Sequence, residues 1–250
     1  MSSENIQSPI ALELREAEFQ DDAEPLVYYG HWDKIGGSAE MINTGSSAMI
    51  TLPNRNRKPF ITGGPLKGKY IFEQLHFHWG DCNEYGCEHL LEGNTYSMEA
   101  HAVHYNEKYK NFQEAVTKPD GLAVTGFFIH GLGDKDCTEF KKISDGIERI
   151  TKPGGKTRLG ADCLSFLKLQ ELSKHYYNYV GSLTTPPYNE VVQWIVYRTP
   201  IYVSEKQIAA FRSLKCHDET KCIVNNYRDI QQPTRSPKII FTRNTLKSKL

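Results

Sequence analysis

Hydrophobic and polar residues alternate in several short runs of this chain, whereas runs with the helical period are few. Alternation with a period of two, in segments rich in β-branched and aromatic residues, is typical of strands with one buried face. The pattern predicts strands at 48–52, 70–79, 98–105, 123–130, 191–197 and 238–242, and helices at 141–150 and 205–214, the second capped by Ser204. We therefore expect a mostly β protein of the α+β class, with a large twisted, chiefly antiparallel sheet and a few short peripheral helices.

Nothing in the composition divides the 250 residues into parts. The chain has no internal repeat, low-complexity tract or flexible linker, so we expect one domain over 1–250 with frayed tails at 1–6 and 244–250. Thirty basic residues balance thirty acidic ones, which leaves no charge to attract nucleic acid. No apolar run approaches the roughly 18 residues of a membrane helix. We expect a monomer with no nucleic-acid partner and no membrane span.

The two ends of the chain bear on where the protein resides. Residues 1–7 lack the basic and apolar segments of a signal peptide. We expect a cytoplasmic protein, or a secreted one whose leader is missing from this chain. The final residues, Ser248-Lys249-Leu250, match a peroxisomal signal, but we favour an accidental ending of a basic tail over this interpretation.

The six cysteines are expected to be free thiols, because a chain of this length does not need disulfide bonds to fold. Two close pairs stand in loop-like segments where a local bridge is sterically possible, Cys82 with Cys87 and Cys216 with Cys222. Neither pair has the spacing of a thiol metal site or of a redox motif. Bridged and free states therefore both stay open for these four residues.

Three histidines on two predicted strands form the strongest candidate site. His76 and His78 are two residues apart on one strand, so both imidazoles project from the same face. His101 lies on the next strand, on the same side as Glu99 and Val103. A second strand that pairs with the first would place His101 opposite the other two. Three neutral nitrogens and one open position are the arrangement of a catalytic zinc site.

Two polar neighbours support a metal site here. Gln74 precedes His76 on the same strand face, and Glu99 precedes a histidine in the same way. A ligating histidine usually donates its other N–H to a carboxylate or carbonyl oxygen, which both residues offer. Two alternatives stay open at this point. The histidines could be structural or exposed without a metal, or they could belong to a cupin with iron or manganese, whose glutamate would fall at Cys82 or Asn83.

The segment QLHFHWG at 74–80 resembles the eukaryotic-type α-class carbonic anhydrases, and the likeness extends along nearly the whole chain. Further motifs of that family stand in order, namely QSPI at 7–10, GGPL at 63–66, EH at 88–89, EAHAVH at 99–104, DGLAV at 120–124, GSLTTPP at 181–187, Trp194 and NNYR at 225–228. The resemblance implies a zinc enzyme of the lyase class. Its reaction would be the reversible hydration of carbon dioxide, a small-molecule substrate, to bicarbonate and a proton.

The resemblance also implies roles for individual residues. The three histidines match the zinc ligands, and Gln74, Glu99 and Tyr179 match the residues that support them by hydrogen bonds. Thr184 matches the threonine that orients the attacking hydroxide while it donates its own proton to Glu88. The residues that match the apolar substrate pocket are Val103, Val124, Leu183, Val192 and Trp194.

The chain departs from the family pattern in two places. Counting back without gaps from Gly64, the position of the proton-shuttling histidine holds Ser46, which cannot titrate near neutral pH. We expect proton release to limit turnover for this reason. The chain also begins only six residues before Gln7, a shortened start for the family. These departures leave open a second interpretation, namely a non-catalytic carbonic anhydrase-related binding module. The complete set of ligands argues against it.

Overall fold

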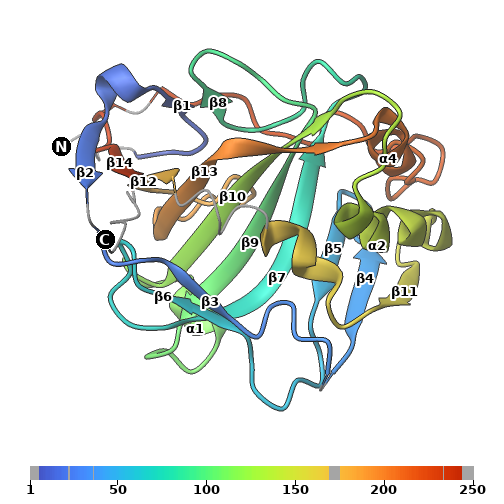
Figure 1. The fold of residues 1–250 in the computed structure, drawn as a ribbon, viewed down its shortest axis with the longest axis horizontal. Helices are drawn as coiled ribbons and strands as arrows, with labels where there is room; N and C mark the ends of the chain where they lie inside the picture. The colour runs from blue at the N-terminus through green and yellow to red at the C-terminus, as the bar shows by residue number, and fades with distance from the viewer. Residues whose placement is uncertain (1–5, 22, 36, 169–174, 233, 244–250) are drawn as a thin grey trace, which may run out of the picture.

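The computed structural model describes residues 6–21, 23–35, 37–168, 175–232 and 234–243. Within these residues a sheet of 12 strands dominates the fold (Figure 1). Its main path runs through β11 (Lys156–Leu159), β4 (Ala39–Asn43), β5 (Ala48–Thr51), β7 (Tyr70–Trp79), β9 (Met98–Asn106), β10 (Leu122–Gly131), β13 (Val192–Val203), β12 (His175–Gly181), β14 (Ile240–Arg243) and β2 (Glu18–Asp21).

Shorter strands complete the β structure. β6 (Phe60–Thr62) pairs with β7, and β3 (Val27–Tyr29) pairs with β6. β1 (Ala11–Leu12) and β8 (Leu90–Leu91) form a separate parallel pair. Most ladders of the large sheet are antiparallel, and the exceptions among the described strands are β10 with β13 and β14 with β2. The expectation of a mostly β, chiefly antiparallel architecture is confirmed.

The helices are few and lie at the periphery. Besides α1 (Phe112–Ala115) there are α2 (Thr138–Ile147), α4 (Glu205–Phe211) and the 3-10 turns Leu14–Glu16, Glu148–Ile150 and Cys163–Leu167. Ser204 caps α4 as predicted, because its Oγ accepts the Gln207 N–H at 3.2 Å and the Gln207 side chain accepts the Ser204 N–H. Among the described helices, none has the length and apolar character needed to cross a membrane.

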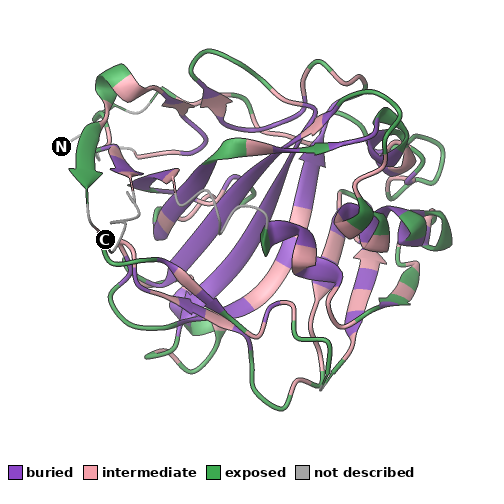
Figure 2. Cartoon of the chain, viewed as in Figure 1, coloured by how far each residue is buried: buried purple, intermediate pink, exposed green. Residues whose placement is uncertain are grey.

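The two faces of the sheet pack into different clusters. On β7, the side chains of Tyr70, Phe72, Leu75 and Phe77 join a core that also contains residues of α2 and α4. The opposite face packs a second cluster that includes Val103, Val124, Tyr179 and Trp194. The central strands are accordingly buried along most of their length (Figure 2). The predicted metal ligands therefore lie on the face away from α2 and α4.

A β-bulge interrupts the ladder between β7 and β9. Phe72 pairs with His104 and Gln74 pairs with Val103, so Glu73 is an extra residue on β7. The core side chains shift from even to odd positions across this point, from Phe72 to Leu75. The bulge therefore changes which residues of β7 face the histidine side.

Ile6, which the sequence places in the first tail, makes a defined contact in the structure. The Ile6 N–H donates a hydrogen bond to Glu190 Oε1 at 3.1 Å. The remainder of the expected tails, 1–5 and 244–250, lies outside the described residues, and so does the Ser-Lys-Leu ending.

Candidate metal centre

The pairing of β7 with β9 brings the three histidines together. His76 is the direct cross-strand partner of His101, and His78 is the partner of Glu99. One ring nitrogen from each of the three histidines lies within 4.8 Å of the others. The strand alternation and the antiparallel return predicted from the sequence are thus both present. This spacing is suited to three ligands around one ion.

The second nitrogen of each ring is held by a hydrogen-bond acceptor. Each acceptor is an oxygen, so each ring donates the proton on that nitrogen and keeps a lone pair on the other. The pairs are His76 Nδ1 to Gln74 Oε1 at 2.9 Å, His78 Nδ1 to the Asn226 carbonyl oxygen at 2.8 Å, and His101 Nε2 to Glu99 Oε1 at 2.8 Å. The nitrogens left for a metal are His76 Nε2, His78 Nε2 and His101 Nδ1.

The protonation of these rings suits a metal. Burial is the largest cause that lowers the pKa of all three histidines, and for His76 the pKa falls well below its usual value. Neutral imidazole is the form that binds metal ions. His78 Nε2 is buried and has no hydrogen-bond partner among the described residues. Burial of a nitrogen that has no hydrogen-bond partner costs free energy unless a ligand binds to it. The donor set therefore fits a divalent ion.

The three ligand histidines differ in how far they are exposed to solvent. His78 and His101 are 3% and 1% exposed, whereas His76 is partly exposed. His76 is therefore the ligand in contact with solvent. Three nitrogen ligands would leave an ion a further coordination position.

Glu99 anchors the innermost ligand through a fully buried carboxylate. Its Oε2 accepts the backbone N–H groups of Glu88 and His89, both at 2.9 Å, and its Oε1 contacts the rings of His101 and His89. Burial acts to raise the pKa of Glu99, but the two histidines outweigh it and hold the pKa well below the usual range. Glu99 therefore stays ionised and fixes which nitrogen of His101 carries the proton.

Close packing leaves room for this carboxylate only because a glycine lies beside it. Gly126 on β10 is the cross-strand partner of His101. A Cβ at this position would lie 3.1 Å from Glu99 Oε1. The glycine is therefore needed here because it lets the charged side chain of Glu99 approach β10. It does not form a turn.

The polar chain continues from Glu99 away from the ligands. His89 Nε2 lies 2.7 Å from the Tyr179 hydroxyl, which donates to Ser8 Oγ at 2.9 Å. A second group could also hold an ion by distance alone, because one donor atom each of His89, Glu99 and His101 lies within 4.8 Å of the others. Their close atoms, however, already hydrogen-bond one another at 2.7 and 2.8 Å. Tyr179 therefore acts on the site through His89 and Glu99.

Glu88 lies against the ligands with its carboxylate almost fully buried. Its Oε1 accepts the Arg228 N–H at 2.8 Å and lies 3.2 Å from His78 Nδ1, and its Oε2 is 3.8 Å from His101 Nδ1. Burial raises the pKa of Glu88 to about 7, while the neighbouring His101 ring and the Thr184 hydroxyl lower it. Because the Thr184 hydroxyl acts directly on the Glu88 carboxylate, the predicted threonine and glutamate lie together in the structure.

The predicted apolar pocket residues gather beside the histidines. Val103 and Val124 are cross-strand partners, and Val124 also pairs with Trp194. The ring of Trp194 lies 4.8 Å from the ring of His101, measured between centroids. All belong to the second cluster, with Val192 buried in it and Leu183 packed against it. The five residues therefore form one apolar wall next to the ligands.

Ser46 lies in the turn between β4 and β5, with its side chain exposed. Its carbonyl oxygen accepts the Asn226 Nδ2 hydrogen at 2.9 Å, and the Asn226 carbonyl is the acceptor for His78. The turn is thus linked to the metal centre through one residue. The serine hydroxyl itself lies 3.2 Å from that of Thr44.

Two features of the site were not predicted from the sequence. Asn226 orients His78 from 148 positions further along the chain, and no local pattern indicates a contact of that kind. Glu73 joins the histidine side through the bulge, and two adjacent polar residues, Glu73 and Gln74, within an alternating strand are the signal that could have revealed it.

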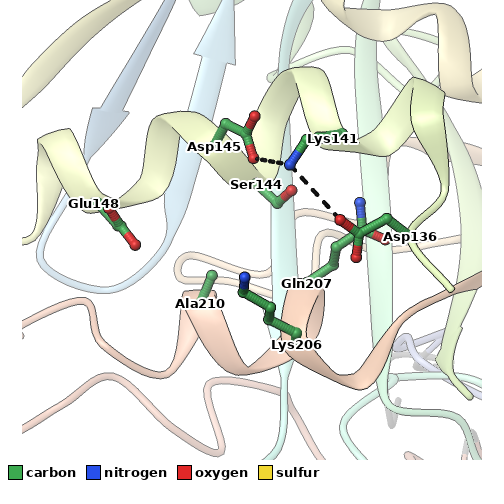
Figure 3. A pocket seen from close by; sticks show the side chains of 8 residues that line it. All are labelled: Asp136, Lys141, Ser144, Asp145, Glu148, Lys206, Gln207 and Ala210. Carbon is green, nitrogen blue, oxygen red and sulfur yellow. Dashed lines mark hydrogen bonds and ion pairs between the residues drawn. The ribbon is translucent and has the colours of Figure 1, made fainter. Parts of the chain in front are cut away.

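A surface pocket between α2 and α4 is separate from the histidines (Figure 3). It measures about 170 Å³, and the Lys141 ammonium group spans it between Asp145 at 2.9 Å and Asp136 at 3.6 Å. Lys141 therefore offsets part of the acidic charge of this pocket.

All six cysteines are free, so neither of the two possible bridges forms.

Comparison with known proteins agrees with this geometry. The family model for eukaryotic-type carbonic anhydrases matches residues 1–240. Carbonic anhydrase 7 of Homo sapiens is 38% identical over 230 residues, which cover 90% of this chain and 84% of that protein. Carbonic anhydrase 1 of Monodelphis domestica is 35% identical over 238 residues, covering 93% and 87%. Carbonic anhydrase 5A, mitochondrial, of Homo sapiens is 36% identical over 230 residues, covering 90% and 73%. The chain belongs to the eukaryotic-type carbonic anhydrase family, whose enzymes hydrate carbon dioxide.

Proposed function

We propose that this protein is a zinc-dependent enzyme that hydrates carbon dioxide reversibly, and that proton release limits its turnover. The observation that carries the proposal is the set of three neutral imidazole nitrogens that face one another, each ring fixed by a hydrogen bond on its far side. Three nitrogen ligands with an accessible fourth position suit zinc better than the oxygen-rich sites that magnesium and calcium prefer.

His76, His78 and His101 would hold the ion. Zinc bound there supplies Lewis acidity, which makes a water molecule acidic enough to provide hydroxide at neutral pH; carbonic anhydrase is the standard example of this chemistry. The protein fixes the orientation of each ring through its own acceptors, which are the Gln74 amide oxygen, the Asn226 carbonyl oxygen and the Glu99 carboxylate. Glu99 adds negative charge behind His101 and thereby strengthens this ligand as an electron donor.

Thr184 and Glu88 would orient the attacking hydroxide. Glu88 Oε2 is buried and has no hydrogen-bond partner among the described residues, so it is available to accept the Thr184 hydroxyl proton. Thr184 Oγ1 can then only accept a hydrogen bond from the nucleophile, which turns a lone pair toward the substrate. This arrangement requires an ionised Glu88.

The apolar wall would bind carbon dioxide beside the nucleophile. The substrate is uncharged, and its transfer from water to an apolar surface loses no strong hydrogen bond. Val124 and Trp194 supply such a surface next to His101. Bicarbonate is charged and gains nothing from this wall, which favours its release.

Each hydration also produces a proton that must leave. Ser46 occupies the expected shuttle position, and a hydroxyl group does not accept a proton near neutral pH. Transfer to dissolved buffer would then set the maximal rate. A non-catalytic binding module is not favoured, because the ligands, their supports and Thr184 with Glu88 are all present together.

The test combines metal analysis with rate measurement. The purified protein is expected to contain one zinc per chain and to hydrate carbon dioxide in a reaction that sulfonamides inhibit. His101→Ala should lose both properties while keeping its circular dichroism spectrum, and His175→Ala, on β12 away from the ligands, serves as the matched control. Undiminished hydration by His101→Ala would falsify the assignment. The cytoplasmic location and monomeric state stay predictions, which cell fractionation and light scattering test.

A further inference from the structure

Glu73 is a charged residue on the metal side of the sheet that the mechanism above does not use. The neighbouring core positions of β7 are Phe72 and Leu75, which both pack on the helix side. Ile71 packs in the cluster of the metal face. The two residues of the bulge, Glu73 and Gln74, lie between these positions and are both partly exposed. The bulge therefore places Glu73 on the same face as Gln74, the residue that orients His76.

This face of β7 carries the positions of the strand that solvent reaches. The partly exposed positions of β7 are 71, 73, 74 and 76, and they are the positions directed away from the helix-side core. His76 is the accessible ligand, and Glu73 precedes it by three residues along the strand. A solute that approaches the ligand nitrogens from solvent therefore passes within the electric field of the Glu73 carboxylate.

A lysine offsets part of that charge. The Lys58 Nζ donates to the Tyr105 hydroxyl at 3.2 Å and lies 5.7 Å from the centre of the same ring. Tyr105 pairs with Ile71, next to the bulge. Lys58 is also the charged group that acts on Glu73, whose pKa burial raises and Lys58 lowers. Lys58 and Glu73 thus interact electrostatically on this face, and Glu73 is the more buried of the two.

We propose that Glu73, with Lys58 as its counter-charge, is a specificity-determining residue that weakens the binding of small anions at the metal centre relative to uncharged carbon dioxide. The inference rests on the proposed function, because it assumes an ion at the three histidines. It concerns anions as a chemical class, with bicarbonate as the anion of the reaction itself.

The physical basis is a repulsion between like charges at medium range. A fixed carboxylate about 10 Å from an anion, in a medium with much of the dielectric response of water, changes the affinity by about two- to threefold. The carboxylate does not act on a neutral molecule in this way. Removal of the Lys58 charge should have the opposite effect, because the carboxylate then lacks its partial compensation.

The probe is thiocyanate, titrated into the cobalt-substituted protein and followed by visible absorption at low ionic strength. Glu73→Gln is expected to lower the thiocyanate dissociation constant about two- to threefold, and Lys58→Gln to raise it. Both differences should shrink when sodium sulfate raises the ionic strength, since the Debye length falls from about 10 Å at 0.1 M to about 3 Å at 1 M. In steady-state assays, Glu73→Gln should lower the KM for bicarbonate and leave the KM for carbon dioxide unchanged.

Glu107→Gln is the matched control, because it removes the same charge beyond the end of β9, where Glu107 faces Lys69 at 3.9 Å. Equal dissociation constants for wild type, Glu73→Gln and Glu107→Gln would overturn the inference. A Glu73→Gln effect that persists at high ionic strength would also overturn it, since a rearranged site rather than charge would be the cause. A protein that binds no metal at all would instead overturn the proposed function, and this inference with it.

Discussion

His76 and His101 face each other directly across the β7–β9 ladder, with their ring centroids 5.4 Å apart. A slip of one residue in this register would turn one of the two rings to the opposite face of the sheet. The register is held by large core side chains on the other face, such as Phe72 and Leu75. The metal centre is thus fixed by the packing of a core that it does not touch.

Removal of the charge behind His101 should weaken metal binding. Glu99→Gln replaces the ionised acceptor with a neutral amide, so the ring loses its strongest orienting partner. We expect zinc affinity to fall by about 10- to 100-fold, measured by competition with a chromophoric chelator. Glu148→Gln, an exposed substitution beside α2, is the control. Equal affinity in the wild type and Glu99→Gln would contradict the assigned role.

A side chain at Gly126 should disturb the same carboxylate. Gly126→Ala places a Cβ 3.1 Å from Glu99 Oε1, and Glu99 has little freedom to move because both its oxygens are already bonded. We expect a loss of about 1–3 kcal/mol in the free energy of unfolding, together with weaker zinc binding. Urea unfolding and chelator competition measure the two effects. Wild-type stability and affinity in this variant would show that Glu99 relaxes freely.

Proton release should depend on the buffer. For wild type, we expect kcat to rise with the concentration of imidazole buffers at constant pH and ionic strength, because Ser46 offers no titratable group. Ser46→His supplies an imidazole, and its kcat at low buffer concentration should exceed that of the wild type. Ser46→Gln, which has similar size and no useful pKa, is the control. A wild-type rate that is independent of buffer would refute the limiting step.

Acid should destabilise the fold through a second pair of histidines. His104 Nε2 lies 3.0 Å from His31 Nε2, both rings are buried, and burial lowers the pKa of His104 to about 3. The unfolded histidine has a pKa of about 6.5. Between these values the unfolded chain binds a proton that the folded chain does not, so the free energy of unfolding decreases as the pH falls from about 6.5. The slope is up to about 1.4 kcal/mol per pH unit for this residue.

His104→Gln tests this prediction, because the amide can retain a hydrogen bond to His31 but takes up no proton. Between pH 7 and pH 5, the variant should lose about 2 kcal/mol less stability than the wild type, measured by urea unfolding with a chelator present. The chelator removes the contribution of metal binding, which has its own pH dependence. Parallel losses in the two proteins would show that His104 does not titrate on unfolding.

Local sequence patterns predicted the two strands that carry the histidines and the face on which these histidines lie. β7 has the bounds expected from its alternation, 70–79, and β9 extends one residue beyond the expected end. The shared face of His76 and His78 follows from the same period. Short strands such as β3, β6 and β11 escaped prediction, because three or four residues carry too little periodicity to stand out.

Contacts between distant segments required the resemblance or the structure. Thr184 and Glu88 lie in irregular segments, and nothing in either sequence neighbourhood indicates the other. The His31–His104 pair joins positions 73 residues apart, and neither sequence neighbourhood indicates the other. The helix expected at 141–150 instead begins at Thr138 and ends at Ile147, followed by a 3-10 turn. Tertiary packing decides such features, and period alone does not.

The carbonyl of Asn226 that orients His78 has a consequence for biosynthesis. Once residue 101 has been synthesised, every ligand side chain exists, yet the acceptor for His78 lies more than a hundred residues further along the chain. The nascent chain can offer nitrogens to a metal but cannot hold them all in the binding orientation. The protein can therefore bind the metal with full affinity only after the segment that contains Asn226 has been translated and lies against β7.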